Sequence, residues 1–126
     1  SLICHGCLIE EGATVIRSVL SPGVTIRSGC RIEDSIILTD TTIEENSVIL
    51  RSILDKRIRI GKNCQIGANS DANLEIAMIG RNSIVPDGMI IHAGGTVGTD
   101  VVSSDYPGKE VKPGEYIQTR RLPNEI

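Results

Sequence analysis

Aliphatic side chains recur in three columns when residues 1–67 are written in rows of 17, the first row lacking one position. The columns lie six, six and five positions apart along the chain. This spacing fits neither the 3.6-residue period of a helix nor the alternation of a single long strand. It predicts three short strands per row, each with one inward side chain, stacked into a triangular parallel β-helix with strands about 4.8 Å apart. The twelve column residues are Ile3, Leu20, Ile37 and Leu54; Ile9, Ile26, Ile43 and Ile60; and Val15, Ile32, Ile49 and Ile66.

Small residues form two further columns near the expected corners of this prism. One column is Ala13, Cys30, Ser47 and Cys64, and the other is Ser1, Ser18, Ser35 and Ser52. We interpret both as stacked structural groups, and not as rows of nucleophiles. With no Phe or Trp and two Tyr, the core must be built from aliphatic ladders. The same composition leaves no aromatic platform for single-stranded nucleic acid, and a net charge of -3 argues against duplex DNA as a partner.

The 17-residue period breaks after residue 67. The polar, turn-rich stretch that follows predicts a loop at 68–78 that leaves the helix. Aliphatic residues six apart then resume at Ile79, Val85, Ile91 and Val97. We therefore expect a β-helix over residues 1–98, followed by an irregular tail at 99–126. Because open β-helix ends expose unpaired backbone, we expect the tail, with its three prolines, to cap one end.

Other sequence features bound the setting of the protein. Cys4 and Cys7 form a C-x-x-C pair without a second pair of ligands, so no metal site is predicted. No apolar run is long enough for a membrane span, and no signal peptide is recognisable. Because nothing in the four cysteines demands disulfides, we expect a reduced, cytoplasmic protein. The chain starts at Ser1, already inside a repeat, and we expect it to be part of a longer protein.

Several short motifs resemble known families. The segment Ile60–Ile66, with the pattern I-G-x-x-C-x-I, resembles the hexapeptide-repeat family, which implies a left-handed parallel β-helix. Over about residues 1–98 the chain is also similar to the C-terminal domain of glucose-1-phosphate adenylyltransferases, or ADP-glucose pyrophosphorylases. The blocks that carry this second resemblance are S-V-L-S-P-G-V at 18–24, E-D-S-I-I-L at 33–38, R-S-I-L-D-K at 51–56 and V-P-D-G at 85–88.

The second resemblance implies a division of labour between domains. In that family an N-terminal catalytic domain joins ATP and glucose 1-phosphate with Mg²⁺, giving ADP-glucose and pyrophosphate for glycogen or starch synthesis. The β-helix contributes to a tetramer and to a site for phosphorylated regulators. The Gly94, Gly95 and Gly98 cluster does not match a phosphate-binding loop. We therefore expect no catalytic residue, cofactor or metal in this chain, and a catalytic domain upstream as its partner.

The row at 51–67 concentrates positive charge, with five cations and one carboxylate. Arginine forks suit phosphate oxygens, so we predict that an anionic effector, such as a sugar phosphate, contacts this row. The predicted contacts are Arg51, Lys56, Arg57 and Arg59. The alternative is that these cations pair with the acidic residues of the preceding row, which are Asp34, Asp40, Glu44 and Glu45.

Three other interpretations remain open from the sequence. The chain could be the β-helix of a different sugar-phosphate nucleotidyltransferase, such as a mannose-1-phosphate guanylyltransferase-like protein. It could be a free-standing trimeric acyltransferase, in which His92 would act as general base. It could also be a scaffold without a ligand. The sequence upstream of Ser1 separates the first of these from the second.

Overall fold

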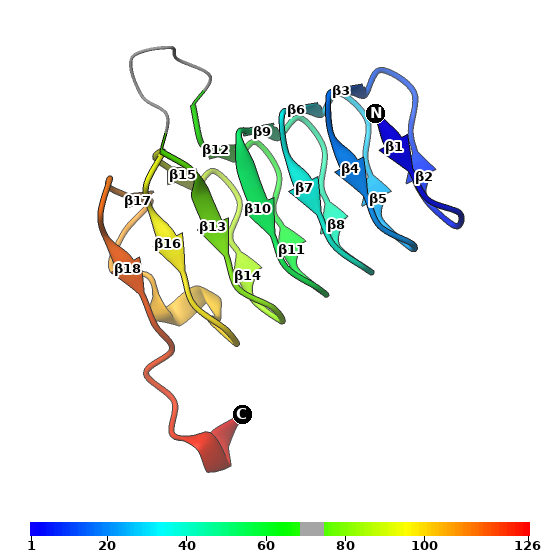
Figure 1. The fold of residues 1–126 in the computed structure, drawn as a ribbon. Helices are drawn as coiled ribbons and strands as arrows, with labels where there is room; N and C mark the ends of the chain where they lie inside the picture. The colour runs from blue at the N-terminus through cyan, green and yellow to red at the C-terminus, as the bar shows by residue number, and fades with distance from the viewer. Residues whose placement is uncertain (69–74) are drawn as a thin grey trace.

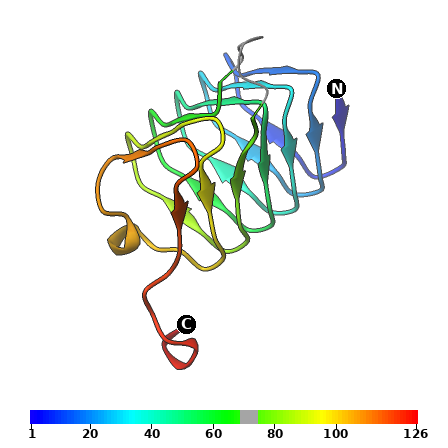
Figure 2. The same ribbon diagram turned by 60° about the vertical axis from the view of Figure 1, so that its left-hand side comes forward.

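A computed structural model describes residues 1–68 and 75–126 as a parallel β-helix. Figure 1 shows the coils stacked side by side along one axis, and Figure 2 shows the three flat faces that they enclose. Each face is a sheet in which every strand pairs in parallel with strands of the neighbouring coils. The predicted β-helix is confirmed.

Sheet A has seven strands: β1 (Leu2–Ile3), β4 (Val19–Leu20), β7 (Ile36–Ile37), β10 (Ser52–Leu54), β13 (Ala77–Ile79), β16 (Thr96–Val97) and β18 (Tyr116–Ile117). Sheet B has five: β2 (Leu8–Ile9), β5 (Thr25–Ile26), β8 (Thr42–Ile43), β11 (Arg59–Ile60) and β14 (Ile84–Val85). Sheet C has six: β3 (Thr14–Ile16), β6 (Arg31–Glu33), β9 (Val48–Leu50), β12 (Gln65–Ile66), β15 (Ile90–Ile91) and β17 (Glu110–Val111). There are also two short 3₁₀ helices in the described residues: η1 (Ser103–Asp105) lies between β16 and β17, and η2 (Pro123–Glu125) follows β18.

The predicted aliphatic columns are the core of the prism. Strand pairing aligns Ile3, Leu20, Ile37 and Leu54 in sheet A, and the other two columns align in sheets B and C. From the second coil onward these side chains are fully buried, whereas Ile3 in the first coil is exposed. The ladders are therefore closed by neighbours on both sides except in the first coil.

The small-residue columns hold the corners together. The hydroxyl of Ser35 donates to the carbonyl oxygen of Glu33 at 2.8 Å and accepts the N–H of Ser52 at 3.1 Å. Ser18 makes the equivalent pair of bonds one coil earlier. In the other column the thiol of Cys30 donates to the carbonyl oxygen of Glu44. The structural interpretation of both columns is confirmed.

The predicted loop at 68–78 is too long at its C-terminal end. Ala77 and Met78 belong to β13, where they pair with Ser52 and Ile53 of β10. Ala77 is buried at the corner position that Ser18, Ser35 and Ser52 occupy in earlier coils. Another small residue therefore fits the same position. Residues 69–74 lie outside the described part of the chain.

The β-helix also extends beyond the predicted end at residue 98. Strands β17 and β18 pair with β15 and β16, and bury Val111 and Ile117 in line with the earlier ladders. Residues 99–117 therefore complete another coil and are not a separate irregular tail. The prolines were misleading because Pro107 and Pro113 lie outside the strands, where no N–H is needed for the ladder.

Candidate functional site

The four predicted effector contacts do not converge on one site. Arg51 lies at the corner between β9 and β10, on the edge where sheets C and A meet. Lys56 and Arg57 lie in the turn between β10 and β11, on the edge between sheets A and B. Arg59 projects from β11 on the outer side of sheet B, because its neighbour Ile60 points inward. Sheet A thus separates Arg51 from the other three.

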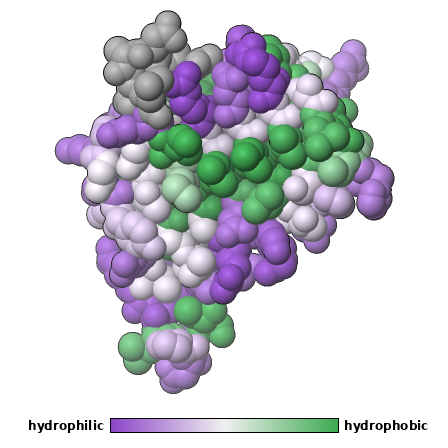
Figure 3. Space-filling view, viewed as in Figure 1, coloured by the Kyte–Doolittle hydropathy of each residue, from purple (hydrophilic) through white to green (hydrophobic). Residues whose placement is uncertain are grey.

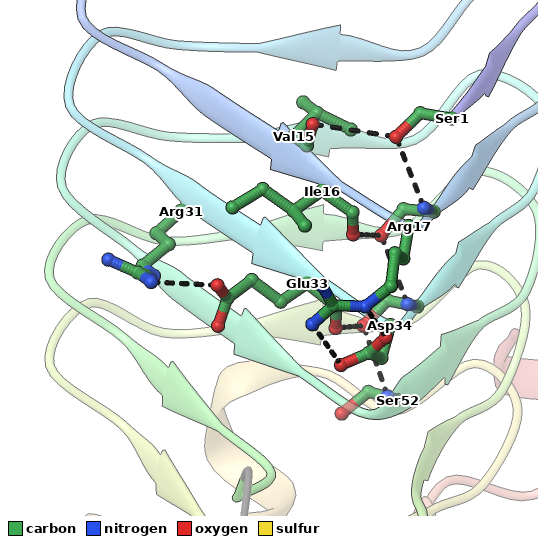
Figure 4. Close-up of polar contacts among 10 residues, drawn as sticks. Ser1, Val15, Ile16, Arg17, Arg31, Glu33, Asp34 and Ser52 are labelled. Carbon is green, nitrogen blue, oxygen red and sulfur yellow. Dashed lines mark hydrogen bonds and ion pairs between the residues drawn. The ribbon is translucent and has the colours of Figure 1, made fainter.

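Arg51 stands in a charged column at its corner. Arg17, Asp34 and Arg51 occupy the same corner of successive coils, each with a positive φ. The guanidinium of Arg17 donates to both oxygens of Asp34, at 2.7 and 3.1 Å (Figure 4). These bonds lower the pKa of Asp34, and the nearby charge of Arg51 lowers it further. Arg51 is therefore close to a carboxylate of the preceding row, as the alternative interpretation expects.

Arg59 ends a second chain of alternating charges on sheet B. Its guanidinium lies 3.2 Å from a carboxylate oxygen of Glu44. Glu44 also lies 3.7 Å from Arg27, which binds Glu10 at 3.0 Å. The hydrogen bond from Arg27 lowers the pKa of Glu10. Arg59 thus has a carboxylate partner in the preceding coil, which the alternative interpretation also anticipated.

Lys56 and Arg57 remain exposed, and one more cation joins them. The N–H of Asn82 donates to the carbonyl oxygen of Lys56, so Arg81 and Asn82 occupy the same turn one coil later. The guanidinium of Arg57 donates to the side-chain oxygen of Asn82 at 2.8 Å. Among residues 1–68 and 75–126, no ion pair joins Lys56, Arg57 or Arg81 to a carboxylate. We call these three residues the basic edge.

Sequence reasoning missed Arg81 because the coil that carries it follows the break in the period. The signal that could have found it is the pair Arg81-Asn82, which precedes Val85 by the same interval that separates Lys56-Arg57 from Ile60. Once β13 and β14 are aligned with β10 and β11, the offset between the two turns is fixed. The basic edge therefore spans two coils.

His92, the residue of the acyltransferase interpretation, lies just after β15 and is partly exposed. Its Nε2 contacts a carboxylate oxygen of Glu110 in β17, on the next coil of sheet C. This contact would hold the imidazole in one orientation, as a positioned base requires. It equally serves as a cross-coil pair on the surface.

The cysteines are placed for packing. Cys30 and Cys64 are buried, and burial raises the pKa of both thiols, which keeps them protonated at neutral pH. Cys4 and Cys7 are partly exposed and unbridged. Within the described residues, no group of three or more His, Cys, Asp or Glu side chains could hold a metal ion. In the same residues no helix is long and apolar enough to cross a membrane.

Comparison with known proteins identifies the family to which the repeat belongs. The family described as "GlmU-like, C-terminal hexapeptide" matches residues 1–85. The chain belongs to this hexapeptide family. Two curated relatives are named glucose-1-phosphate adenylyltransferase. The protein from Thermomicrobium roseum is 41% identical over 86% of this chain, and the one from Acetivibrio thermocellus is 28% identical over 93%. The resemblance drawn from the sequence motifs is confirmed.

This hexapeptide domain spans only about a third of those relatives, 32% of the first and 29% of the second. Solved structures with a similar fold include the acetyltransferase domain of PglB from Neisseria gonorrhoeae, with a TM-score of 0.66 and 17% identity over 94% of this chain and 54% of that one. A putative acetyltransferase from Desulfovibrio desulfuricans has a TM-score of 0.61 and 20% identity over 79% of this chain and 23% of that one. At such identities these structures establish the fold alone.

Proposed function

We propose that this chain is the C-terminal β-helix domain of a glucose-1-phosphate adenylyltransferase, which makes ADP-glucose from ATP and glucose 1-phosphate for glycogen synthesis. The observation that carries the proposal is the 41% identity to the Thermomicrobium roseum protein of that name, over 86% of this chain. A second relative of the same name matches 93% of the chain. Both are about three times longer, which leaves room for a separate catalytic domain.

The chemistry belongs to that N-terminal domain of the same chain. It would hold ATP, the sugar phosphate and the Mg²⁺ that neutralises the phosphates during transfer. The β-helix would contribute to a cytoplasmic homo-oligomer, a tetramer by family resemblance, and to the response to a sugar-phosphate effector. Its rigid, ladder-filled prism suits that role, because it holds exposed corner residues at fixed spacings.

Within the predicted effector contacts, the structure favours Lys56 and Arg57 over Arg51 and Arg59. Arg51 and Arg59 lie beside Asp34 and Glu44, which compensate their charge. Lys56 and Arg57 lie on the basic edge together with Arg81, and within residues 1–68 and 75–126 none of the three forms an ion pair with a carboxylate. An effector phosphate between these three residues would gain charge-assisted hydrogen bonds without displacing a carboxylate.

The assay that tests the proposed function uses the full-length protein encoded by the gene. Pyrophosphate release from ATP and glucose 1-phosphate is compared with release from GTP and mannose 1-phosphate, and with acyl transfer from acetyl coenzyme A. We expect at least a hundredfold preference for the first pair. Equal or faster turnover of the second pair, or acyl transfer abolished by His92→Ala, would reject the proposed function. A gene lacking a nucleotidyltransferase domain would also reject it.

The effector contacts are tested in the same full-length enzyme. Hexose phosphates and inorganic phosphate are titrated against the rate of ADP-glucose formation. Arg57→Ala and Arg81→Ala should each raise the half-saturating effector concentration about tenfold, the loss of one charge-assisted hydrogen bond. Arg31→Ala is the matched control, since Arg31 is an exposed arginine on sheet C that pairs with Glu33. If all three variants respond alike, the basic edge is not the effector site.

A further inference from the structure

The outer side of sheet A carries a continuous row of apolar side chains. Alternation within each short strand sends one residue outward, and strand pairing stacks these residues directly on one another. The row crosses the front of the molecule in Figure 3. Three of its apolar members are open to solvent, with Leu2 63% exposed, Ile36 41% and Met78 48%. We call it the apolar stripe, and its members are Leu2, Val19, Ile36, Ile53 and Met78, continued by Thr96 and Tyr116.

The other two faces are built differently. On sheet B the outward column runs Leu8, Thr25, Thr42, Arg59 and Ile84. On sheet C it runs Thr14, Arg31, Val48, Gln65, Ile90 and Glu110. Polar or charged residues separate the apolar members of both columns, as is usual for a solvated face. The five consecutive apolar residues of sheet A are a departure from that pattern within one and the same repeat.

A hollow of about 350 Å³ adjoins the stripe beside β10, β13 and β16. Its walls include Leu38, Ile53, Met78 and Tyr116. Gly80 and Gly98 also line it and contribute no side chains, and a Cβ on Gly80 would lie 2.6 Å from the backbone of Gly98. The hollow is therefore built by close packing of two coils. It is large enough to receive an apolar or aromatic anchor side chain from a partner.

The size of the stripe indicates what kind of partner it fits. Five apolar positions about 4.8 Å apart and about 10 Å wide give roughly 250 Å² of apolar face. A stable complex of separate proteins usually buries about 800 Å² on each partner, so the stripe by itself is too small for a free partner or a second copy. A tethered domain needs less area, because the linker gives it a high effective concentration. Most of the length of both relatives lies outside the matched region, so such a domain is available.

We infer that the apolar stripe is the surface on which the N-terminal nucleotidyltransferase domain of the same chain docks, with one of its apolar side chains in the hollow. This inference rests on the proposed function for the presence of that domain. The contact would run along sheet A and leave the outer side of sheet C uncovered. The basic edge borders the same sheet, so an effector bound there would lie next to the domain contact.

Cysteine labelling of the full-length protein tests this docking. Ile36→Cys places a thiol on the stripe, and Ile90→Cys is the matched control on sheet C, since the two isoleucines are 41% and 40% exposed and both point outward from a strand. Labelling by a maleimide is followed at each position by peptide mass spectrometry. We expect the thiol at 36 to react at least tenfold more slowly than the thiol at 90. Rates within twofold of each other would overturn the inference.

A charged substitution on the apolar stripe provides a second test of the docking surface. In full-length protein, Ile36→Glu should accelerate labelling of Met78→Cys about tenfold, whereas Ile90→Glu should leave that rate unchanged. Circular dichroism checks that both variants keep the β-helix. Protection at 36 that disappears on dilution, together with a shift from oligomer to monomer in light scattering, would assign the stripe to a second copy and overturn the inference.

The two proposals fail separately. Absence of ADP-glucose formation with the stripe protected would reject the proposed function and leave a tethered docking domain in place. ADP-glucose formation with the stripe fully reactive would keep the proposed function and reject the docking surface.

Discussion

The first four coils and the later coils build the same ladders from different lengths of chain. In the first region the inward residues of sheet A recur every 17 residues, from Ile3 to Leu54. The ladder then continues through Ile79, Val97 and Ile117, at intervals of 25, 18 and 20 residues. The inward places are filled equally well in both regions, since Ile79, Val97 and Ile117 are all buried. Burial at the strand positions is thus preserved while the corners absorb changes in length.

Gly67 marks the corner at which the regular region ends. Its φ of +78° lies in the left-handed region, and a Cβ at this position would collide with the carbonyl oxygen of Leu50. Earlier coils pass the same corner with Arg17, Asp34 or Arg51 in a left-handed conformation. Glycine allows the chain to turn out one residue sooner, where the longer connection begins. The two regions therefore differ at their corners and agree in their strands.

The largest difference between the regions should come from a charge in the core. Ile43→Asp places an unpaired carboxylate between Ile26 and Ile60 in the middle of the regular stack, and should lower the free energy of unfolding by about 4 kcal/mol or more. Val111→Asp affects the last strand of sheet C and should let only that coil fray, because each coil contacts only its neighbours. Chemical denaturation measures the first effect and amide hydrogen exchange the second.

The control for this pair is Thr42→Asp, on the same strand as Ile43 but pointing outward. Its cost should stay within about 1 kcal/mol. If Ile43→Asp and Thr42→Asp melt alike, the inward register of β8 is wrong. If Val111→Asp is as damaging as Ile43→Asp, the β-helix unfolds as one unit and the distinction between its regions has no energetic meaning.

A smaller loss of stability should follow when the corner serine is removed in either region. Because the expected loss is the same in both, it tests directly whether the two regions are equivalent. The hydroxyl of Ser47 donates to the carbonyl oxygen of Gly61 at 2.7 Å and accepts the N–H of Cys64 at 3.1 Å. Ser83 makes the same pair of bonds, to Gly98 and from Val101, at the same distances. Ser47→Ala and Ser83→Ala should each cost about 1–3 kcal/mol, because two buried backbone groups lose their partner.

Ser47→Cys is the milder counterpart, since the chain itself uses cysteine at this corner and the Cys30 thiol lies 2.9 Å from the carbonyl oxygen of Glu44. Thermal melting of the three variants measures the order. If Ser47→Ala is destabilised but Ser83→Ala is as stable as the parent, the later corner relaxes around the missing hydroxyl. The two corners would then share their hydrogen-bond geometry but not its contribution to stability.

The same division explains how far the sequence predicts the fold. The twelve ladder residues and both small columns were correct because each place is occupied again in every 17-residue row. The coil formed by residues 99–117 was missed because Val111 and Ile117 follow their predecessors by 20 residues, and the turns between them have no counterpart in earlier rows. Periodicity identifies a repeated environment, and it fails where one corner is lengthened.

The candidate site was predicted less well, for a related reason. The row at 51–67 was correctly identified as rich in cations, but membership of one row does not place residues on one edge. A row surrounds the whole prism, so Arg51 and Arg57 lie on different edges, while Arg81 from a later coil lies beside Lys56. Asp105, a buried residue of η1 outside the basic edge, was also not predicted. It binds the N–H groups of Val102 and Arg120, and the second of these depends on the path of the last coil.

The smallest effect compares two carboxylates held by different means. Asp34, in the regular region, has its pKa lowered by the guanidinium of Arg17 on the surface. Asp105, in the last coil, is buried, which raises its pKa, but the N–H groups of Val102 and Arg120 outweigh burial and leave the pKa below its ordinary value. Each group therefore stabilises the fold above its unfolded pKa, near 3.9, and this contribution is lost as the pH falls through the folded pKa.

Salt should separate the two carboxylates. Raising NaCl from about 0.02 M to about 1 M shortens the screening length from tens of ångströms to about 3 Å, which weakens an exposed ion pair and has little effect on neutral N–H donors. The pKa of Asp34, followed by carboxyl ¹³C NMR, should move up toward its ordinary value, as it should in Arg17→Gln at low salt. The pKa of Asp105 should move much less. Equal shifts would mean that the charge of Arg121, and not the backbone, holds Asp105, and that both regions rely on surface charge.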